Sequence, residues 1–209
     1  MVSIAIIDYG SGNLRSAEKS FARMAKPRKV WLTSDPEVVA KADHIVLPGV
    51  GAFGDCAEGL RAIDGMVEAL TERVRNQGRP FLGICVGMQL LCAQGHERGV
   101  HEGLGWLEAQ VHPLDVPPDL KVPHMGWNNL HIERAHKVLD GLDGEDVYFV
   151  HGFGAKFSGD ASAIAASVDY GGAVVAAVAR DTFIGTQFHP EKSQQAGLRL
   201  IENFLEWRP

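Results

Sequence analysis

The first 94 residues alternate short apolar runs with stretches in which apolar side chains recur every three or four positions. The runs are typical of buried strands, and the spacing of three and four residues is that of one helix face. Repeated strand–helix units of this kind predict an α/β fold, with a flavodoxin-like, mostly parallel sheet flanked by helices. The expected strands are Val2–Asp8, Lys29–Thr33, Ile45–Leu47 and Pro80–Ile84.

Helices are expected between these strands. A residue that often caps helices, Asn13, precedes the first of them. The apolar face of that helix consists of Leu14, Ala17, Phe21 and Met24. The clearest helix ends at Gly78, and its apolar face consists of Leu60, Ile63, Val67, Leu70 and Val74. Shorter helices are expected after Asp35-Pro36 and over Val86–Ala93.

The pattern changes after Gly95, where shorter segments lie between a glycine- and histidine-rich stretch and a proline-rich one. Apolar runs over Ala163–Val168, Ala173–Ala179 and Thr182–Phe188, separated by short turns, predict antiparallel hairpins. A last helix is expected from Ser193 to about Trp207. Because no linker or internal repeat divides the chain, residues 1–209 are expected to form a single domain.

Composition and charge restrict the partners of the chain. Of its 209 residues, 45% are hydrophobic and 22% are charged, which is typical of a globular protein. The net charge of −6 gives no footprint for nucleic acid or an anionic membrane, and the longest apolar run, Ala173–Ala179, is far shorter than the ~20 residues of a membrane span. Three cysteines do not form a disulfide framework, and Met1–Gly10 lacks the basic start of a signal peptide. A cytoplasmic location is therefore expected.

The strongest chemical signal lies where the strand Pro80–Ile84 ends. Residues 83–87 read Gly-Ile-Cys-Val-Gly, which is the layout of a nucleophile elbow with Cys85 in place of serine. Glycines two residues on either side leave room for the sharp turn that exposes the nucleophile, and the backbone N–H of Val86 is a candidate oxyanion donor. The alternative interpretation is a buried structural cysteine.

A second signal is the segment Phe-His-Pro-Glu at residues 188–191. In extended backbone, residues two apart point the same way, and Pro190 favours extended backbone at His189. Glu191 is therefore expected to reach the imidazole of His189 and to fix its tautomer. A base oriented in this way is what a thiol nucleophile needs, since a free cysteine with a pKa of ~8.5 is only slightly ionised at neutral pH. The alternative is a surface histidine beside a helix-capping carboxylate.

A third signal is the loop Pro-Gly-Val-Gly at residues 48–51, which follows a central strand. Ligands in open α/β sheets bind at the carboxyl edge of the strands, where a glycine loop can offer backbone N–H groups to an oxyanion. Val50 and Gly51 are the candidate donors, unless the loop is a plain turn. Because glycines flank Val50, the peptide planes beside it are able to reorient at little steric cost.

Taken together, residues 83–89, 48–51 and 188–191 resemble the class I glutamine amidotransferases. The resemblance runs nearly end to end, and it implies that Cys85 attacks the side-chain amide of glutamine while His189, held by Glu191, moves the proton. It also implies that the backbone at Val50, Gly51 and Val86 stabilises the oxyanion. The residues implied to contact the substrate are Gly51, Gln89, Gly152 and Phe153. The cycle yields glutamate and ammonia and requires no cofactor and no metal.

Finer features resemble the glutaminase subunits of this class that serve histidine biosynthesis. These features are the segments Asp8–Leu14, Val122–Asn128 and Glu191–Ser193. The resemblance implies a heterodimer with a barrel-shaped cyclase subunit, which uses the ammonia to make imidazole glycerol phosphate and an aminoimidazole ribotide. It also implies that four residues lie near this partner: Asn13, Trp127, Asn128 and Lys192.

Two positions depart from the pattern of those subunits. Val86 stands where leucine is expected, which leaves a backbone donor intact. Residues 151–153 read His-Gly-Phe instead of His-Ser-Tyr, so contacts through the side chains of Gly152 and Phe153 change while backbone contacts remain.

Other functions compete with this interpretation. A cysteine peptidase of the same architecture would share the elbow, without needing the glycine loop or Gln89. A regulatory scaffold would be expected to have lost one of the three catalytic residues, and all are present. The cluster of His96, Glu97, His101 and Glu102 lacks a metal-binding spacing and is interpreted as solvated surface.

Overall fold

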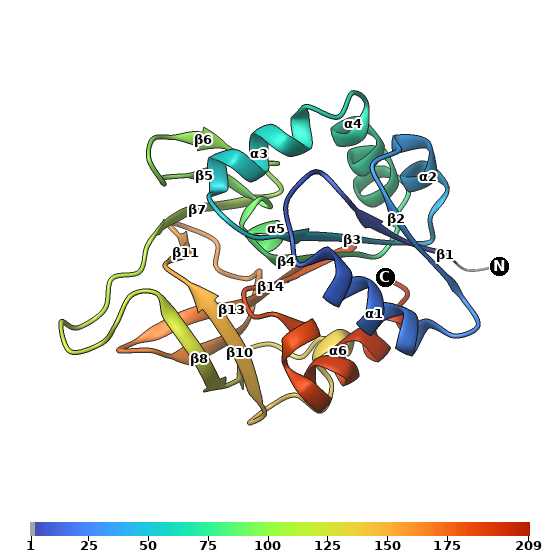
Figure 1. The fold of residues 1–209 in the computed structure, drawn as a ribbon. Helices are drawn as coiled ribbons and strands as arrows, with labels where there is room; N and C mark the ends of the chain where they lie inside the picture. Colours follow the sequence, from blue (N-terminus) through green and yellow to red (C-terminus); the bar gives the residue numbers. More distant parts are fainter. Residues whose placement is uncertain (1–2) are drawn as a thin grey trace.

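The computed structural model describes residues 3–209, and its centre is an eight-stranded sheet (Figure 1). The strands follow the order β2-β1-β3-β4-β14-β13-β12-β9. Neighbours from β2 to β14 are parallel, and those from β14 to β9 are antiparallel. The bounds are β1 Ser3–Ile7, β2 Lys29–Thr33, β3 His44–Gly49, β4 Phe81–Cys85, β9 His131–Ile132, β12 Ile164–Asp169, β13 Ala173–Arg180 and β14 Phe183–Thr186. The predicted α/β class is confirmed; Val2, in the first predicted strand, lies outside the described residues.

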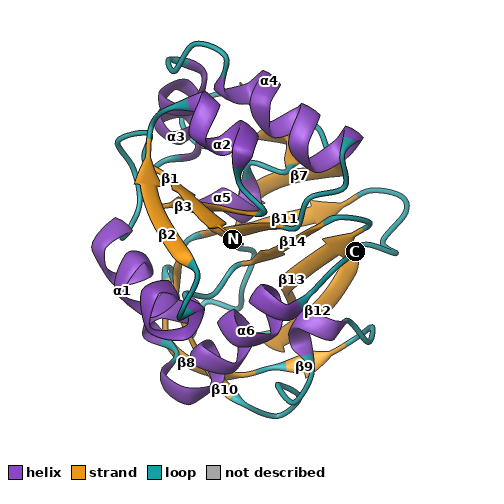
Figure 2. Cartoon of the chain, turned by 90° about the vertical axis from the view of Figure 1, so that its right-hand side faces the viewer, coloured by secondary structure: helices purple, strands orange, loops and turns teal. Residues whose placement is uncertain are grey.

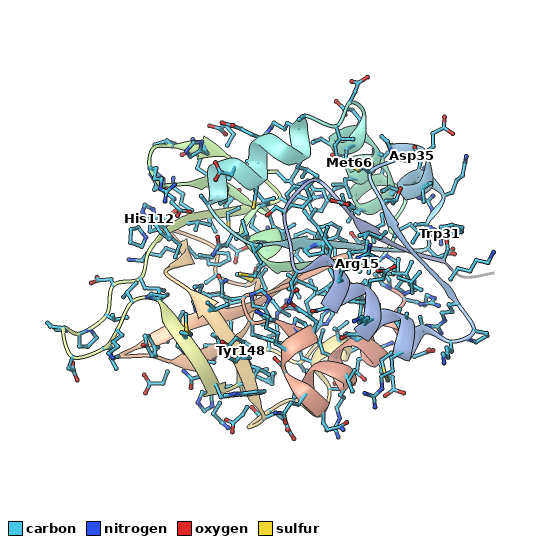
Figure 3. The ribbon with its side chains drawn as sticks, viewed as in Figure 1. Arg15, Trp31, Asp35, Met66, His112 and Tyr148 are labelled. Carbon is cyan, nitrogen blue, oxygen red and sulfur yellow. The ribbon has the colours of Figure 1, made fainter. Side chains whose placement is uncertain are left out.

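Helices cover both faces of this sheet (Figure 2). On one face lie α1 Leu14–Ala25 and α6 Gln194–Glu206, and on the other lie α2 Pro36–Lys41, α3 Phe53–Arg61 and α4 Met66–Leu70. The strands β3 and β4 are buried at every position, as expected for parallel strands covered on both faces. At the sheet edge, β2 leaves Trp31 48% exposed (Figure 3). Within residues 3–209, no helix is long and apolar enough to cross a membrane.

Two smaller sheets extend the carboxyl side of the central sheet. One follows the order β11-β7-β5-β6, and the other pairs β10 with β8. The chain passes from β10 to β11, and so from one small sheet to the other, through Gly152 alone. The bounds are β5 Cys92–Gly95, β6 His101–Glu102, β7 Leu107–Pro113, β8 His124–Asn129, β10 Asp146–His151 and β11 Phe153–Phe157.

The hairpins predicted after residue 160 are confirmed as β12, β13 and β14, and the last helix is confirmed as α6. The prediction of one continuous helix through Leu60–Val74 was wrong. The segment is divided into α3 and α4 by a turn at Gly65, whose φ of +77° favours glycine, and α4 continues into the π-helical turn η1 Thr71–Asn76. The helix predicted over Val86–Ala93 was too long, because α5 covers only Val86–Gln89 and β5 begins at Cys92.

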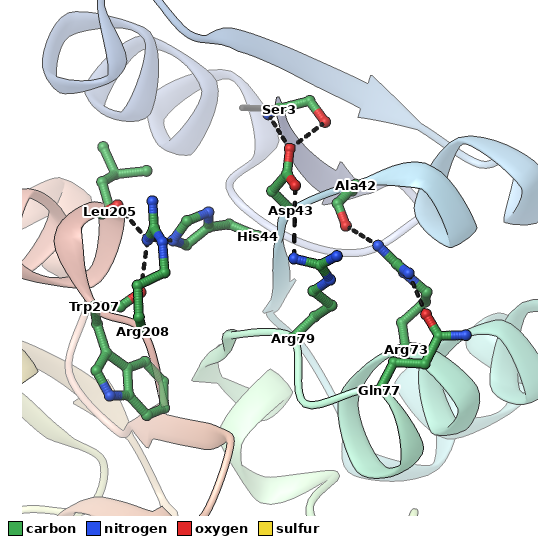
Figure 4. A network of polar contacts seen from close by, with 10 residues as sticks. All are labelled: Ser3, Ala42, Asp43, His44, Arg73, Gln77, Arg79, Leu205, Trp207 and Arg208. Carbon is green, nitrogen blue, oxygen red and sulfur yellow. Dashed lines mark hydrogen bonds and ion pairs between the residues drawn. The ribbon is translucent and has the colours of Figure 1, made fainter. Parts of the chain in front are cut away.

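The amino ends of β1, β3 and β4 carry a polar network, at the sheet edge opposite to the elbow (Figure 4). Asp43 accepts a hydrogen bond from the Ser3 N–H at 2.8 Å and lies 3.8 Å from Arg79. Next to it, Arg208 donates to His44 Nε2 at 3.0 Å. The Arg208 contact attaches the C-terminal segment to the amino edge of the sheet. The candidate site lies at the opposite, carboxyl edge.

Candidate active site

Cys85 is the last residue of β4 and the start of a sharp turn into α5. Its φ is +55°, a conformation that residues with a side chain rarely adopt. The flanking glycines make the turn possible, because a Cβ on Gly87 would lie 1.8 Å from Leu47 O and one on Gly83 would lie 2.5 Å from Gly87 O. The helix behind the turn has only four residues, so its dipole contributes less to the site than a full helix would.

His189 and Glu191 form a buried pair beyond the end of β14. His189 Nδ1 lies 2.8 Å from Glu191 Oε1, and both side chains are 2% exposed. His189 has the extended backbone expected before a proline, whereas Glu191 lies in the 3-10 turn η3 Pro190–Lys192. The segment is held by the His189 N–H, which donates to Tyr148 O at 3.0 Å, and by the Ser193 hydroxyl, which donates to His189 O at 2.7 Å.

The charge state of His189 follows from its neighbours. Burial lowers its pKa, but the adjacent Cys85 sulfur and Glu191 carboxylate more than offset this effect and raise the pKa to about 9. Among the described residues, His189 Nε2 has no hydrogen-bond partner, so the sulfur acts on the ring through proximity and not through a formed hydrogen bond. These two neighbours therefore favour an imidazole that holds a proton.

Asn13 takes part in this site in a way that the sequence did not suggest. It occupies the N-cap position of α1, but its side chain makes no capping hydrogen bond. Instead, Asn13 Nδ2 donates to Glu191 Oε1 at 3.4 Å. The predicted N-cap position of Asn13 is confirmed, but its amide is directed at the carboxylate and not at the helix.

The loop after β3 holds Val50 against the loop before α1. The Val50 N–H donates to Ser11 Oγ at 3.2 Å, while Val50 O accepts hydrogen bonds from Ser11 Oγ and, at 3.4 Å, from Cys56 Sγ. In a trans peptide the C=O and N–H groups point to opposite sides, so the Gly51 N–H points away from Ser11. Of the three predicted oxyanion donors, Val50 is thus engaged elsewhere, whereas Gly51 and Val86 line a cavity with Cys85.

This cavity has a volume of about 300 Å³, at the small end of ligand pockets, which suits a ligand of amino-acid size. It brings together nearly all of the predicted catalytic and substrate-contacting residues, and three more that were not predicted to line it. The residues that line it are Val50, Gly51, Cys85, Val86, Gln89, Glu97, Val150, His151, Gly152, Phe153 and His189. The elbow, the histidine and the glycine loop therefore face one enclosed space.

A cysteine elbow, a buried histidine–carboxylate pair and a glycine loop at one cavity agree with what comparison finds. Residues 5–207 match the model of the family described as glutamine amidotransferase class-I. The chain belongs to the class I glutamine amidotransferases.

Full-length relatives refine this assignment. The chain is 54% identical to the imidazole glycerol phosphate synthase subunit HisH of Bradyrhizobium diazoefficiens and 53% identical to that of Rhodopseudomonas palustris, with 100% of both chains covered in each case. Solved structures share the fold at lower identity. PurLQS from Thermotoga maritima has a TM-score of 0.75 at 16% identity, covering 98% of this chain and 97% of that one. A structure described as a glutamine amidotransferase has a TM-score of 0.72 at 20% identity, covering 97% of each chain.

Two polar residues of the site, one behind Cys85 and one in the cavity wall, were missed or misread from the sequence. Gln187, which is fully buried, donates through Nε2 to Cys85 Sγ at 3.6 Å. It stands inside the motif around His189, but nothing in its spacing suggested a contact with the sulfur. Glu97 was interpreted as solvated surface, yet it lines the cavity, and its Oε2 accepts a hydrogen bond from the Phe53 N–H at 2.9 Å.

Gly152 and Phe153, which stand where serine and tyrosine are expected, also lie in the cavity wall. A Cβ added to Gly152 would meet only Val122 Cγ1, at 3.4 Å, so a serine would fit in this place. Phe153 O accepts a hydrogen bond from Gln89 Nε2 at 3.1 Å, which keeps a backbone contact at this position.

The residues expected near a partner gather beside the cavity. Trp127 is 47% exposed, and its ring lies 5.7 Å from the ring of Tyr148, whose place on β10 is labelled in Figure 3. Lys192 Nζ lies 5.6 Å from the centre of the same tyrosine ring. Asn128 points elsewhere, since its Nδ2 donates to Asp169 O at 2.9 Å.

The histidine-rich stretch forms no metal centre in the described part of the chain. Within residues 3–209, no three His, Cys, Asp or Glu side chains are grouped so that they could hold a metal ion. His96 stacks on His112 with 4.3 Å between the ring centroids, and both rings contact Gln110 Oε1.

Proposed function

We propose that this chain is the glutaminase subunit of an imidazole glycerol phosphate synthase, and that it hydrolyses glutamine to glutamate and ammonia for histidine biosynthesis. The observation that carries the proposal is the cavity in which Cys85 faces His189, with Glu191 in contact with the far side of the imidazole. The full-length identity to HisH subunits supports the same assignment.

The first half of the reaction forms a thioester. The Cys85 thiol passes its proton to His189 as the sulfur attacks the side-chain amide carbon, and the carbonyl oxygen becomes an oxyanion within reach of the N–H groups of Gly51 and Val86. His189 Nε2, which has no other partner, then gives its proton to the departing nitrogen, which leaves as ammonia. Glu191 holds the ring through Nδ1 during both transfers.

The second half reverses the roles of His189. The neutral imidazole takes a proton from water, and the resulting hydroxide attacks the thioester carbonyl through a second oxyanion. The C–S bond breaks, the proton held on His189 returns to the Cys85 sulfur, and glutamate leaves. No cofactor enters these steps.

Recognition of glutamine is divided between a charged side chain and a side-chain amide. Glu97 contributes a carboxylate to the cavity wall, which is complementary to the α-ammonium group of an amino acid. Gln89 uses its amide protons on Phe153 O and Gln187 Oε1, so its own oxygen remains as an acceptor for the substrate.

A cyclase subunit is the proposed acceptor of the ammonia. The patch formed by Trp127, Tyr148 and Lys192 is exposed, partly apolar and next to the cavity, which suits a protein partner. Docking there would form a heterodimer in which ammonia passes from one active site to the other.

The experiment is glutamate release from glutamine, measured with the chain copurified with a cyclase subunit. Cys85→Ala is expected to abolish release, and Cys92→Ala, at a buried cysteine whose pKa is raised to about 12 by burial, is the matched control. Retention of more than about a hundredth of the wild-type rate by Cys85→Ala would contradict the proposal, because loss of a nucleophile costs far more than this. Cleavage of peptides instead of glutamine would favour a cysteine peptidase.

A further inference from the structure

Two histidines outside the proposed triad lie side by side in the interior, His124 on β8 and His151 at the end of β10. They are 3% and 6% exposed, and His124 Nδ1 lies 3.2 Å from His151 Nε2. The His124 ring is stacked on Phe149 and Tyr170, with 4.7 Å and 3.9 Å between ring centroids. These neighbours fix how the pair can be oriented.

The contacts at both ends decide which nitrogens carry protons. His151 Nδ1 lies 2.8 Å from Phe153 O, and because a carbonyl only accepts, this nitrogen must carry the hydrogen. A neutral imidazole has one N–H, so His151 Nε2 accepts and His124 Nδ1 donates across the 3.2 Å contact. His124 Nε2 is then an acceptor for Asn128 Nδ2, at 3.4 Å. Both rings are therefore Nδ1–H tautomers.

Neutrality of both rings agrees with their surroundings. Burial lowers the pKa of His124 and also that of His151, the latter to about 4. A proton added to His151 Nε2 would also face the N–H of His124. The pair thus has one arrangement that satisfies all of its contacts at neutral pH.

The inner end of this chain of hydrogen bonds reaches the cavity. Phe153 O accepts from His151 Nδ1 at 2.8 Å and from Gln89 Nε2 at 3.1 Å. Gln89 Nε2 also donates to Gln187 Oε1 at 3.0 Å, and Gln187 Nε2 donates to Cys85 Sγ at 3.6 Å. The orientation of the Gln89 amide therefore depends on a carbonyl that His151 holds.

The outer end reaches strand β8 at Asn128. The amide of Asn128 is fixed on both sides, because its Nδ2 donates to Asp169 O at 2.9 Å and its Oδ1 accepts from the Asn129 N–H at 2.8 Å. Asn128 follows Trp127 on β8, so an uninterrupted series of contacts joins this strand to Cys85.

We propose that His124 and His151 are positioning residues that hold the Phe153 carbonyl, and through it the Gln89 amide, in the orientation that binds glutamine. The proposal rests on the proposed function, because it takes glutamine as the occupant of the cavity. A phenyl ring at either position would fill a similar space. It would remove a donor from the series and leave Phe153 O, or the ring that holds it, less restrained.

The first test is the tautomer of each ring. Long-range 1H–15N correlation spectra of the full chain separate Nδ1–H from Nε2–H imidazoles. We expect both His124 and His151 as neutral Nδ1–H tautomers, and loss of that form for His151 in the variant His124→Phe. An Nε2–H tautomer or a charged ring for His151 in the wild-type chain would overturn the proposal. This result does not depend on any enzymatic activity.

The second test separates KM from kcat for glutamine, in the complex with the cyclase. His151→Phe is expected to raise KM about tenfold, the effect of one lost hydrogen bond, with little change in kcat. His151→Asn places its Nδ2–H near the position of the lost Nδ1–H and is expected to restore most of the affinity. The matched control is His136→Asn, a histidine outside the series that caps η2 Lys137–Leu139 through Val138 N at 3.2 Å, a role that asparagine can fill.

The outcomes are distinct. An unchanged KM in His151→Phe, or equal losses in His151→Phe and His151→Asn, would overturn the positioning role. If wild-type chain with its cyclase releases no glutamate from glutamine, the proposed function fails, whereas the tautomer spectra still decide whether the two rings are held as described.

Discussion

Ser11 and Val50 are joined twice through one hydroxyl group, which accepts a hydrogen bond from the Val50 N–H and donates one to Val50 O. Cys56 Sγ adds a contact to the same carbonyl at 3.4 Å. The two loops involved are 39 residues apart in sequence, so this contact is a tertiary one. An N–H that is held by Ser11 is not free to stabilise an oxyanion.

Removal of this hydroxyl is expected to raise the activity of the chain without its partner. The chain alone should release glutamate slowly, and the cyclase with its nucleotide ligand should accelerate it, since one oxyanion donor is worth about 10²–10³ in rate. Ser11→Ala frees the Val50 peptide and should raise the basal rate severalfold while reducing the stimulation. Steady-state glutamate production is the measurement, and Ser16→Ala on α1 is the control. A basal rate equal to that of the wild type would contradict the role of Ser11.

Glu191→Gln tests the charge behind the histidine. The variant keeps an acceptor for His189 Nδ1 and removes the carboxylate that helps to raise the pKa of His189 to about 9. Because the charge stabilises the imidazolium, its loss should move the alkaline limb of kcat/KM to lower pH. The total loss in rate should be smaller than that of His189→Ala. An unmoved alkaline limb, or the reverse order of losses, would show that the pair does not act in this way.

Glu97→Gln tests recognition of the α-ammonium group. Glutamine keeps an acceptor for the Phe53 N–H, so the start of α3 stays capped, while the charge in the cavity is lost. We expect KM for glutamine to rise about 10- to 100-fold, the range for a charge-assisted hydrogen bond, and kcat to change little. Glu102→Gln, on the exposed strand β6, is the matched control. The same KM in both variants would exclude Glu97 from binding.

Acid should destabilise the fold between pH 6.5 and about 4. Burial lowers the pKa of three histidines, His44, His136 and His151, from 6.5 to about 4. In this window the unfolded chain binds more protons than the folded one, so the free energy of unfolding falls as pH falls, by up to about 1.4 kcal/mol per pH unit for each group. Urea midpoints across the window measure this slope. His44→Gln, which keeps an acceptor for Arg208, should reduce the slope, and an unchanged slope would be evidence against the contribution of His44.

Much of the fold was predictable where burial imposes a simple pattern. The strands β1, β3 and β4 are mostly apolar because both of their faces are covered, and β12, β13 and β14 are separated by turns of clear composition. The small sheets were not predictable, because strands such as His124–Asn129 are half-exposed and rich in polar residues. The break at Gly65 interrupts a regular apolar spacing, and periodicity alone does not reveal such a break.

In the site, too, local motifs were predictable and contacts between distant segments were not. Cys85 with its glycines and His189 with Glu191 are local motifs, so their geometry follows from neighbouring residues. The remaining contacts join distant segments: Asn13 reaches Glu191 across 178 positions, and Gln187 reaches Cys85 across 102. Such pairs depend on the path of whole loops, and a single sequence contains no periodic signal for them.

The single residue between β10 and β11 couples two surfaces with different tasks. On one side of Gly152, β10 pairs with β8, the strand that carries Trp127. On the other side, Phe153 forms the wall of the cavity. Successive Cα atoms are only about 3.8 Å apart, so a one-residue connection is too short to separate the movement of one sheet from that of the other. A displacement of the sheet that carries Trp127 is therefore expected to move the Phe153 side of the cavity as well.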